Sequence, residues 1–314
     1  MKNSFSHVAV LSEEVIKALN IKRDGTYIDC TFGQGRHSNL ILSQLQEAGK
    51  LIAIDRDPQS VSIAKKINDK RFTIKHGLFS NIYKFSKEEN IVRKVNGILL
   101  DLGISTVQIN DAKRGFSFKK DGNLDMRMNP MTGISAKEWL EKAKREEIES
   151  VLKKYGEEKK AYKISKLIFR YNHSRNFKKI TCTKELVNII SKVNSYHKKH
   201  PATRTFQAIR IYINNELEEL KKILEEALRV LAPFGRIVAI SFHSLESRLI
   251  KNFIKKYSSY VIIDQKIFKR NQENDLSQKI KLKLINKVKP KRKEILENPR
   301  SRSSLLRTIE FHVK

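Results

Sequence analysis

The chain has 314 residues, of which 39% are hydrophobic and 31% charged, so it can form one large core or two modest ones. Its formal net charge of +30 exceeds what solubility requires and favours a polyanionic partner, nucleic acid first, although an AT-rich genome would also raise the lysine content. Two cysteines exclude a disulfide framework and a cysteine-based zinc site, and no run approaches the roughly 18 apolar residues that span a bilayer. With no signal peptide at the amino terminus, we expect a soluble, cytoplasmic protein that contacts no membrane.

The first predicted strand leads into a glycine-bearing loop and a helix. The apolar pair Tyr27-Ile28 ends at Asp29, and an amphipathic stretch follows from His37 to Gln46. Between them lie Gly33 and Gly35, which can adopt backbone angles and close ligand approaches that a Cβ would block. This order is typical of doubly wound α/β folds that bind a nucleotide-like ligand, but a lone Gly-x-Gly also occurs in ordinary βα turns.

An acidic residue follows the second predicted strand. The run from Leu51 to Ile54 ends at Asp55, about 20 residues beyond the glycine loop, where a carboxylate accepts hydrogen bonds from ribose hydroxyls. Asp57 competes for this role, but Pro58 follows it, so Asp57 is better interpreted as the start of a helix. Ser38 stands where the dinucleotide fingerprint requires a third glycine, which disfavours a pyrophosphate and leaves an adenosyl ligand without phosphate allowed.

Two more strands and a change of pattern follow. A third strand is predicted at 71–75, with Phe79 just beyond its tip, and a fourth at 95–100, ending on Asp101. From about Gln108 the periodicity becomes helical, which predicts an inserted helical region of roughly 100 residues with a surface dense in Lys and Arg. The expected helices of this region are 135–143, 146–155, 160–171 and 183–193.

The last third of the sequence predicts a return to the sheet. Residues 203–231 carry one apolar stripe at steps of three and four, which predicts a single long helix packed on a core. Strands are expected at 235–242, 261–269 and 305–313, with a Lys-rich arm at 264–302. Seven strands with this insertion predict a Rossmann-like α/β fold of the S-adenosylmethionine-dependent methyltransferase type, with an inserted all-helical domain, rather than a dehydrogenase.

Several motifs together are specific. They resemble those of the bacterial 16S ribosomal RNA cytosine-N4 methyltransferase family, and the resemblance covers essentially the whole chain. The motifs lie at 7–14, 27–38, 53–58, 97–105, 114–118, 124–128, 200–208, 241–246 and 298–304.

The resemblance implies S-adenosyl-L-methionine as cofactor and a P-site cytidine of 16S ribosomal RNA in the small subunit as substrate. It implies a cofactor-binding domain at 1–107 and 204–314, a helical substrate-recognition domain at 108–203, and a monomer or weak dimer. One departure is visible: members resemble Gly-Gly-His in the loop, whereas the middle residue here is Arg36, which would be strained by about 1 kcal/mol if its φ were positive. The implied cofactor contacts are Gly33, Gly35, Arg36, His37, Asp55, Phe79, Asp101 and Gln108.

The chemistry of amine methylation suggests two catalytic candidates. The N4 amine is a poor nucleophile because its lone pair is delocalised into the ring, so an acceptor for the amino hydrogens would help it react. Asp101 is the best candidate acceptor, although it could equally bind only the cofactor. His243, after the strand at 235–242, is a candidate for substrate binding or proton transfer, against the more common structural role of a lone histidine.

Other functions remain open from the sequence. A DNA amino-methyltransferase would carry a Pro-Pro-aromatic loop after the fourth strand, where this chain has Asp101-Leu102-Gly103-Ile104-Ser105. A non-catalytic RNA-binding assembly factor could keep the same fold, and an NAD-dependent dehydrogenase is a distant alternative. No metal site is predicted. Phe116 and Phe118, flanked by basic residues, could stack on an unstacked base or pack within the protein.

Overall fold

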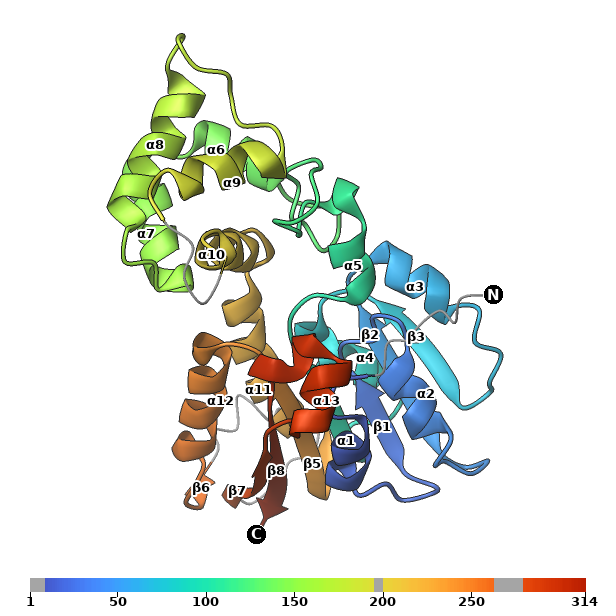
Figure 1. Cartoon of the computed structure of the whole chain (residues 1–314). Helices are drawn as coiled ribbons and strands as arrows, with labels where there is room; N and C mark the ends of the chain where they lie inside the picture. Colours follow the sequence, from blue (N-terminus) through green and yellow to red (C-terminus); the bar gives the residue numbers. More distant parts are fainter. Residues whose placement is uncertain (1–8, 195–199, 263–278) are drawn as a thin grey trace. The chain divides into compact units, whose positions relative to one another are not determined.

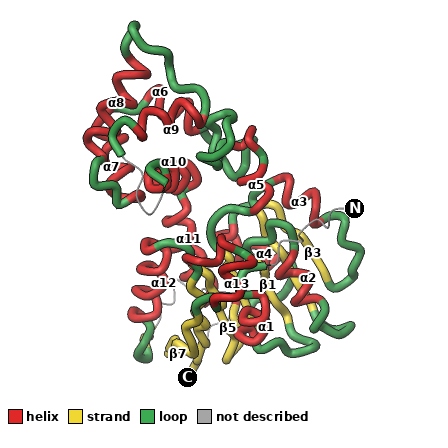
Figure 2. Tube along the Cα trace, viewed as in Figure 1, coloured by secondary structure: helices red, strands yellow, loops and turns green. Residues whose placement is uncertain are grey.

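The chain forms two compact units. The computed structural model describes residues 9–194, 200–262 and 279–314. One unit, here called the sheet unit, comprises Met1–Gly103 and Leu217–Lys314, and the other, the helical unit, comprises Ile104–Glu216. Figure 2 shows that strands dominate the centre of the first and helices the second.

The sheet unit is built on one mixed sheet of eight strands in the order β3-β2-β1-β4-β5-β8-β7-β6 (Figure 1). The five strands from β3 to β5 are parallel, so the carboxyl ends of β1, β2 and β4 meet at one edge. The last three strands are antiparallel to their neighbours. The strands are β1 (Thr26–Asp29), β2 (Lys50–Asp55), β3 (Phe72–His76), β4 (Val95–Asp101), β5 (Leu231–Ser241), β6 (Val261–Ile262), β7 (Lys279–Val288) and β8 (Leu305–Val313).

Helices cover both faces of this sheet, which is why its central strands are apolar throughout rather than alternating. Ile28, Ile98 and Leu100 face one core together with α11 and α12, and Tyr27 and Leu99 face another with α1 and α2. The helices of this unit are α1 (Ser12–Leu19), α2 (Arg36–Leu42), η1 (Phe79–Asn81), α3 (Pro58–Ala64), α4 (Ile82–Glu88), α11 (Glu216–Val230), α12 (Ser244–Lys256), α13 (Arg292–Glu297) and η3 (Pro299–Ser303).

The helical unit has its own hydrophobic core, centred on Trp139, Ile148, Ile164 and Phe206. The four helices expected from periodicity are present within a few residues of their predicted ends. Within the described ranges, no helix of either unit is long and apolar enough to cross a membrane. The helices of this unit are α5 (Thr106–Asn110), η2 (Ala112–Arg114), α6 (Ala136–Lys142), α7 (Arg145–Gly156), α8 (Ala161–His173), α9 (Thr183–Ser191) and α10 (Thr203–Asn214).

The single long helix expected at 203–231 is two helices, and this moves a boundary between the units. Asn215 adopts a left-handed conformation, with φ at 52°, and separates α10 from α11. α10 buries Phe206 and Ile209 in the core of the helical unit, whereas α11 buries Leu220 and Leu224 against the sheet. The helical unit therefore ends at Glu216 rather than at residue 203, and it begins at Ile104 rather than at residue 108.

The Lys-rich segment expected as an arm contains regular structure. Lys279–Val288 forms β7, which pairs with β8 along most of its length and adds a strand to the seven expected, and α13 follows. On the side of β7 that faces away from β8, β6 pairs only with Lys279 and Ile280. The rest of β7 carries the exposed lysines Lys283 and Lys287, and such charges discourage pairing with another chain. The remainder of the expected arm, and most of the strand expected at 261–269, lie outside the described residues.

The close contact between β1 and β4 gives a first prediction. A Cβ on Gly97 would lie 2.8 Å from Cδ1 of Tyr27 and 3.0 Å from Cδ2 of Leu19. Tyr27 cannot easily move, because it is buried and its hydroxyl accepts a hydrogen bond from the backbone N–H of Lys22 at 2.7 Å. We expect Gly97→Ala to lower the free energy of unfolding in urea by about 1–3 kcal/mol through overpacking.

The matched control is the same substitution in a Tyr27→Leu background. The smaller side chain should make room for the added methyl, so the loss from Gly97→Ala should shrink there. Equal losses in both backgrounds would show that the contact with Tyr27 is not the cause.

Candidate functional site

The loop between β1 and α2 carries the two glycines in the conformation that the sequence predicts. Gly33 and Gly35 have φ values of 56° and 73°, in the left-handed region. A Cβ on Gly35 would lie 2.6 Å from the ring of Phe32, so a side chain is excluded there by space as well as by conformation. Arg36 begins α2 and is absent from the non-glycine residues with positive φ, so the strain considered for it does not occur.

Asp55, at the end of β2, holds this loop in place. Its Oδ2 accepts a hydrogen bond from the backbone N–H of Gly33 and its Oδ1 one from that of Asp57, both at 2.8 Å. Burial raises the pKa of Asp55 to about 6, and these hydrogen bonds oppose that shift only in part. Asp57 is the N-cap of α3 and accepts from the N–H of Gln59 at 3.0 Å, which confirms that it begins a helix.

A second carboxylate, which the sequence analysis did not single out, connects β1 to β4. Asp29 is 1% exposed; its Oδ2 accepts from the hydroxyl of Ser38 at 2.7 Å and its Oδ1 from the N–H of Thr31 at 3.1 Å. The Thr31 hydroxyl accepts in turn from the N–H of Asp101 at 2.8 Å. Burial raises the pKa of Asp29, and the bond from Ser38 and the nearby His37 lower it in part. The only feature of the sequence that could have indicated this role of Asp29 is its position as an acidic residue at the end of a predicted strand.

His37 and Asp101 form a pair at this edge. Nε2 of the buried His37 lies 3.5 Å from Oδ2 of Asp101. Burial alone lowers the pKa of His37, but the hydrogen bond and charge of Asp101, with the charge of Asp29, raise it overall. The other carboxylate oxygen of Asp101, Oδ1, is buried and has no hydrogen-bond partner among the described residues. An acceptor oxygen is thus left available beside the glycine loop.

The other two predicted cofactor contacts, Phe79 and Gln108, do not belong to the loop between β1 and α2 or to the acidic strand ends. Phe79 begins η1, just beyond β3, and packs partly buried against the core of the sheet unit. Gln108 belongs to the helical unit, where it forms a capping box with Ser105: its Oε1 accepts from the N–H of Ser105 at 3.0 Å, and the Ser105 hydroxyl accepts from the N–H of Gln108 at 3.2 Å. The sheet unit therefore brings together the loop glycines, His37, Asp55 and Asp101, but not Gln108.

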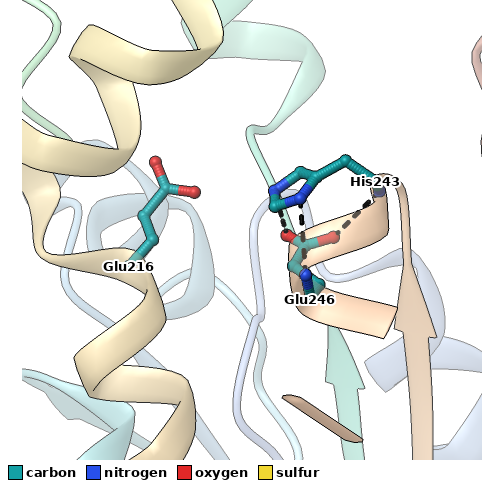
Figure 3. Close-up of side chains that lie close together, drawn as sticks. All are labelled: Glu216, His243 and Glu246. Atoms are coloured by element: carbon teal, nitrogen blue, oxygen red, sulfur yellow. Dashed lines mark hydrogen bonds and ion pairs between the residues drawn. The ribbon is translucent and has the colours of Figure 1, made fainter. Parts of the chain in front are cut away.

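His243 has a clear structural role. It is the N-cap of α12, where its Nδ1 accepts from the N–H of Glu246 at 3.4 Å and its Nε2 lies 3.2 Å from Oε1 of the same residue (Figure 3). Glu246 also accepts from the N–H of Phe242 at 2.7 Å. Glu216, drawn in the same figure, belongs to the helical unit and pairs with Arg210 there. These contacts give His243 a structural role. Its catalytic role stays a prediction.

Phe116 and Phe118, the two phenylalanines considered for base stacking, differ in exposure. Phe116 is 6% exposed and lies in the core, with the guanidinium of Arg114 5.9 Å from its ring centroid. Phe118 is partly buried and stacks on His200, with ring centroids 4.5 Å apart, and meets Phe206 edge-on. Phe116 therefore packs within the helical unit, which was the alternative to stacking on a base.

Parallel strands, a glycine loop and acidic strand ends are the features of α/β proteins that bind nucleoside-like ligands at the carboxyl edge of the sheet. The sequence profile of the MraW methylase family matches residues 4–312, and the chain belongs to this family. It is therefore a methyltransferase, and S-adenosyl-L-methionine is its cofactor.

Curated relatives match along nearly their whole length. A protein of Buchnera aphidicola subsp. Schizaphis graminum is 51% identical over 313 residues, covering 99% of each chain, and one of Wigglesworthia glossinidia brevipalpis is 53% identical over 308 residues, covering 97% of this chain and 98% of its own. Both are named ribosomal RNA small subunit methyltransferase H. This chain is thus similar over its full described length to enzymes of ribosomal RNA methylation.

The raised pKa of Asp55 predicts a pH dependence of stability. Its pKa is about 6 in the folded protein and near 3.8 in a model peptide, so between about pH 4 and 6 the unfolded chain binds fewer protons than the folded one. The free energy of unfolding should fall as the pH rises through this window. Urea unfolding from pH 4 to 7.5 should show this slope, and Asp55→Asn should lack that part of it.

The same group can be titrated directly. NMR of labelled aspartate carboxyl carbons should show one signal with a midpoint near pH 6 that disappears in Asp55→Asn. A midpoint near 4 for Asp55, or an unchanged slope in the variant, would contradict the argument from burial.

Proposed function

We propose that this protein methylates the N4 amine of a P-site cytidine in the 16S ribosomal RNA of the small subunit. The relatives' name supports ribosomal RNA of that subunit as the substrate, and the net charge of +30 supports a polyanionic partner. The choice of N4 and of the P-site cytidine rests on the resemblance of the motifs. The observation that carries the proposal is the buried Oδ1 of Asp101 beside the glycine loop, to which no described residue donates a hydrogen bond.

The strand ends fit an adenosyl sulfonium cofactor. The positive φ values of Gly33 and Gly35 favour a close approach of the ligand to the backbone, and each oxygen of Asp55 keeps a lone pair beyond its one backbone hydrogen bond. We assign ribose binding to Asp55, adenine contact to Phe79, and further contacts to Arg36, His37 and Gln108. The carboxylates around the loop favour a positively charged group electrostatically. When bound, the cofactor supplies a methyl group activated by its sulfonium charge.

Asp101 is assigned to the amine. An N4 nitrogen that forms a bond to carbon loses the delocalisation of its lone pair and becomes more acidic. The Oδ1 of Asp101 would accept a hydrogen bond from the amino group, favour its pyramidal geometry and take up the departing proton. Backbone carbonyls of the loop after β4 would hold the second amino hydrogen.

His37 is a positioning residue in this proposal. Its Nε2 lies 3.5 Å from Oδ2 of Asp101, so it would fix the orientation of the carboxylate and leave Oδ1 for the amine. The backbone of Asp101 is fixed independently, by its N–H bond to the Thr31 hydroxyl. The side chain and main chain of Asp101 are thus held by two different partners from the β1–α2 segment.

The non-catalytic assembly factor considered from the sequence is disfavoured, because the chain belongs to a methylase family. A DNA amino-methyltransferase is disfavoured, because the chain belongs to the MraW methylase family and its relatives are named ribosomal RNA methyltransferases.

The test of the proposed function uses small subunits from cells that lack the enzyme. They are incubated with the full chain and with S-adenosylmethionine carrying a labelled methyl group, and the RNA is then digested with nuclease and analysed by mass spectrometry. We expect label as N4-methylcytidine at one P-site position. Label at another atom would contradict the finer assignment, and no label on free or assembled RNA would contradict RNA methylation.

Two substitutions separate binding from chemistry. Asp55→Ala removes hydrogen bonds to the ribose and should weaken cofactor binding by about 10- to 100-fold, with a smaller change in kcat. Asp101→Ala removes the proton acceptor and should lower kcat by about 10²- to 10⁴-fold, with a smaller change in cofactor affinity. Calorimetry gives the affinity and single-turnover methylation the rate. Equal losses in both quantities for both variants would remove this division of roles.

A further inference from the structure

The segment around α8 concentrates positive charge without acidic residues. Every charged side chain from Lys159 to Lys184 is a lysine or an arginine. α8 itself, Ala161–His173, lies in the helical unit (Figure 1). Its buried side, which includes Ile164 and Ile168, packs in the core of that unit. Its opposite side is therefore fixed in place and faces solvent.

This opposite side forms a regular stripe. Tyr162, Lys166, Arg170 and His173 recur at steps of four, four and three, and Lys163 lies beside them; all five are exposed. Tyr162 is 50% exposed, and the guanidinium of Arg145 lies 4.9 Å from its ring centroid, so part of the ring remains open to solvent. We call these five residues the α8 face.

The cations of the α8 face differ from those of α11. Within the described ranges, no carboxylate forms an ion pair with Lys163, Lys166 or Arg170. On α11, by contrast, each basic residue has an acidic partner three positions earlier. These pairs are Lys221–Glu218, Lys222–Glu219 and Arg229–Glu226. Positive charge is therefore neutralised on α11 and left uncompensated on α8.

Aromatic rings lie among these cations. The rings of Phe169 and His173 stack at 4.0 Å between centroids, and the guanidinium of Arg170 lies 4.7 Å from the ring centroid of Phe177. An arginine held on a ring in this way keeps the edge of its guanidinium free to donate to phosphate oxygens. Cations that contact phosphates, interleaved with rings that can stack on bases, are the pattern of a surface for unpaired nucleic acid.

We propose that the α8 face binds the sugar–phosphate backbone of the ribosomal RNA substrate. The proposal rests on the proposed function for its RNA, and it adds the surface that would hold that RNA. Lys163, Lys166 and Arg170 contact successive phosphates, and the exposed ring of Tyr162 stacks on an unpaired base. The lack of acidic residues in the sequence from Lys159 to Lys184 disfavours a basic protein segment as the occupant and favours a polyanion.

The test compares two variants of the full chain that lose the same charge. K163Q/K166Q/R170Q removes three cations from the α8 face, and K221Q/K222Q/R229Q removes three paired cations from α11. The probes are free 16S ribosomal RNA and small subunits lacking the modification. Affinity is measured as a function of salt concentration, and calorimetry checks that the Kd for S-adenosylmethionine is unchanged in both variants.

We expect the α8 variant to bind free RNA about tenfold or more weakly at physiological salt. The slope of log K against log salt should become shallower by about 2 to 3, because three phosphate contacts are lost. The KM for small subunits should rise, with kcat at saturation unchanged. The α11 variant should behave as the wild type, since its cations are already neutralised.

Three results would overturn the proposal. One is an α8 variant with wild-type affinity and salt slope, and another is an equal loss in the α11 variant, which would reflect net charge only. The third is a loss confined to assembled subunits with free RNA binding intact, which would indicate a ribosomal protein as partner. Failure of the wild type to methylate RNA would instead reject the proposed function, and the RNA-binding comparison would still decide the role of the α8 face.

Discussion

The geometry of the site depends on hydrogen bonds made by carboxylates at the ends of strands. Each of these carboxylates connects its own strand to the backbone at the end of a neighbouring strand. Asp55, on β2, accepts from Gly33 in the loop after β1, and Asp29, on β1, is linked through Thr31 to the backbone of Asp101 on β4. A hydrogen bond to a charged group contributes about 1.5–3 kcal/mol, which offsets part of the cost of burying the charge. Three separate strands are thereby fixed to one loop.

The same arrangement restricts what each carboxylate can do chemically. Both oxygens of Asp29 and of Asp55 already accept bonds from the protein, so these carboxylates orient the loop around them, and Asp55 has only its remaining lone pairs for a ligand. Asp101 differs, because Oδ2 faces His37 while the buried Oδ1 has no partner in the part of the chain that the structure describes. A buried acceptor without a partner is costly, and in an enzyme such a cost is commonly repaid by a ligand. This asymmetry, rather than the mere presence of an acid, distinguishes Asp101 from its neighbours.

The sequence predicted the parts of the structure in which local pattern and tertiary packing agree. Buried parallel strands produce continuous apolar runs, so β1, β2 and β4 and the acids that end them were recognisable. The break at Asn215 was not recognisable, because the apolar residues keep their spacing of three and four across it. The apolar residues before the break nevertheless pack in one core and those after it in another. β7 was missed because much of this strand is exposed and rich in lysine. The role of Asp29 depends on Ser38, a contact that periodicity cannot reveal.

The distribution of charge connects the site to its substrate. A chain with a net charge of +30 nevertheless places Asp29, Asp55 and Asp101 together at the edge of the sheet. An acidic site attracts a sulfonium, tolerates a neutral base and disfavours phosphate, which fits a nucleic acid that enters as an extruded base. The backbone of that nucleic acid must then be held by cations elsewhere, and cations already paired with acids contribute little to this. Uncompensated cations such as those of the α8 face meet that requirement because they are not part of the acidic site.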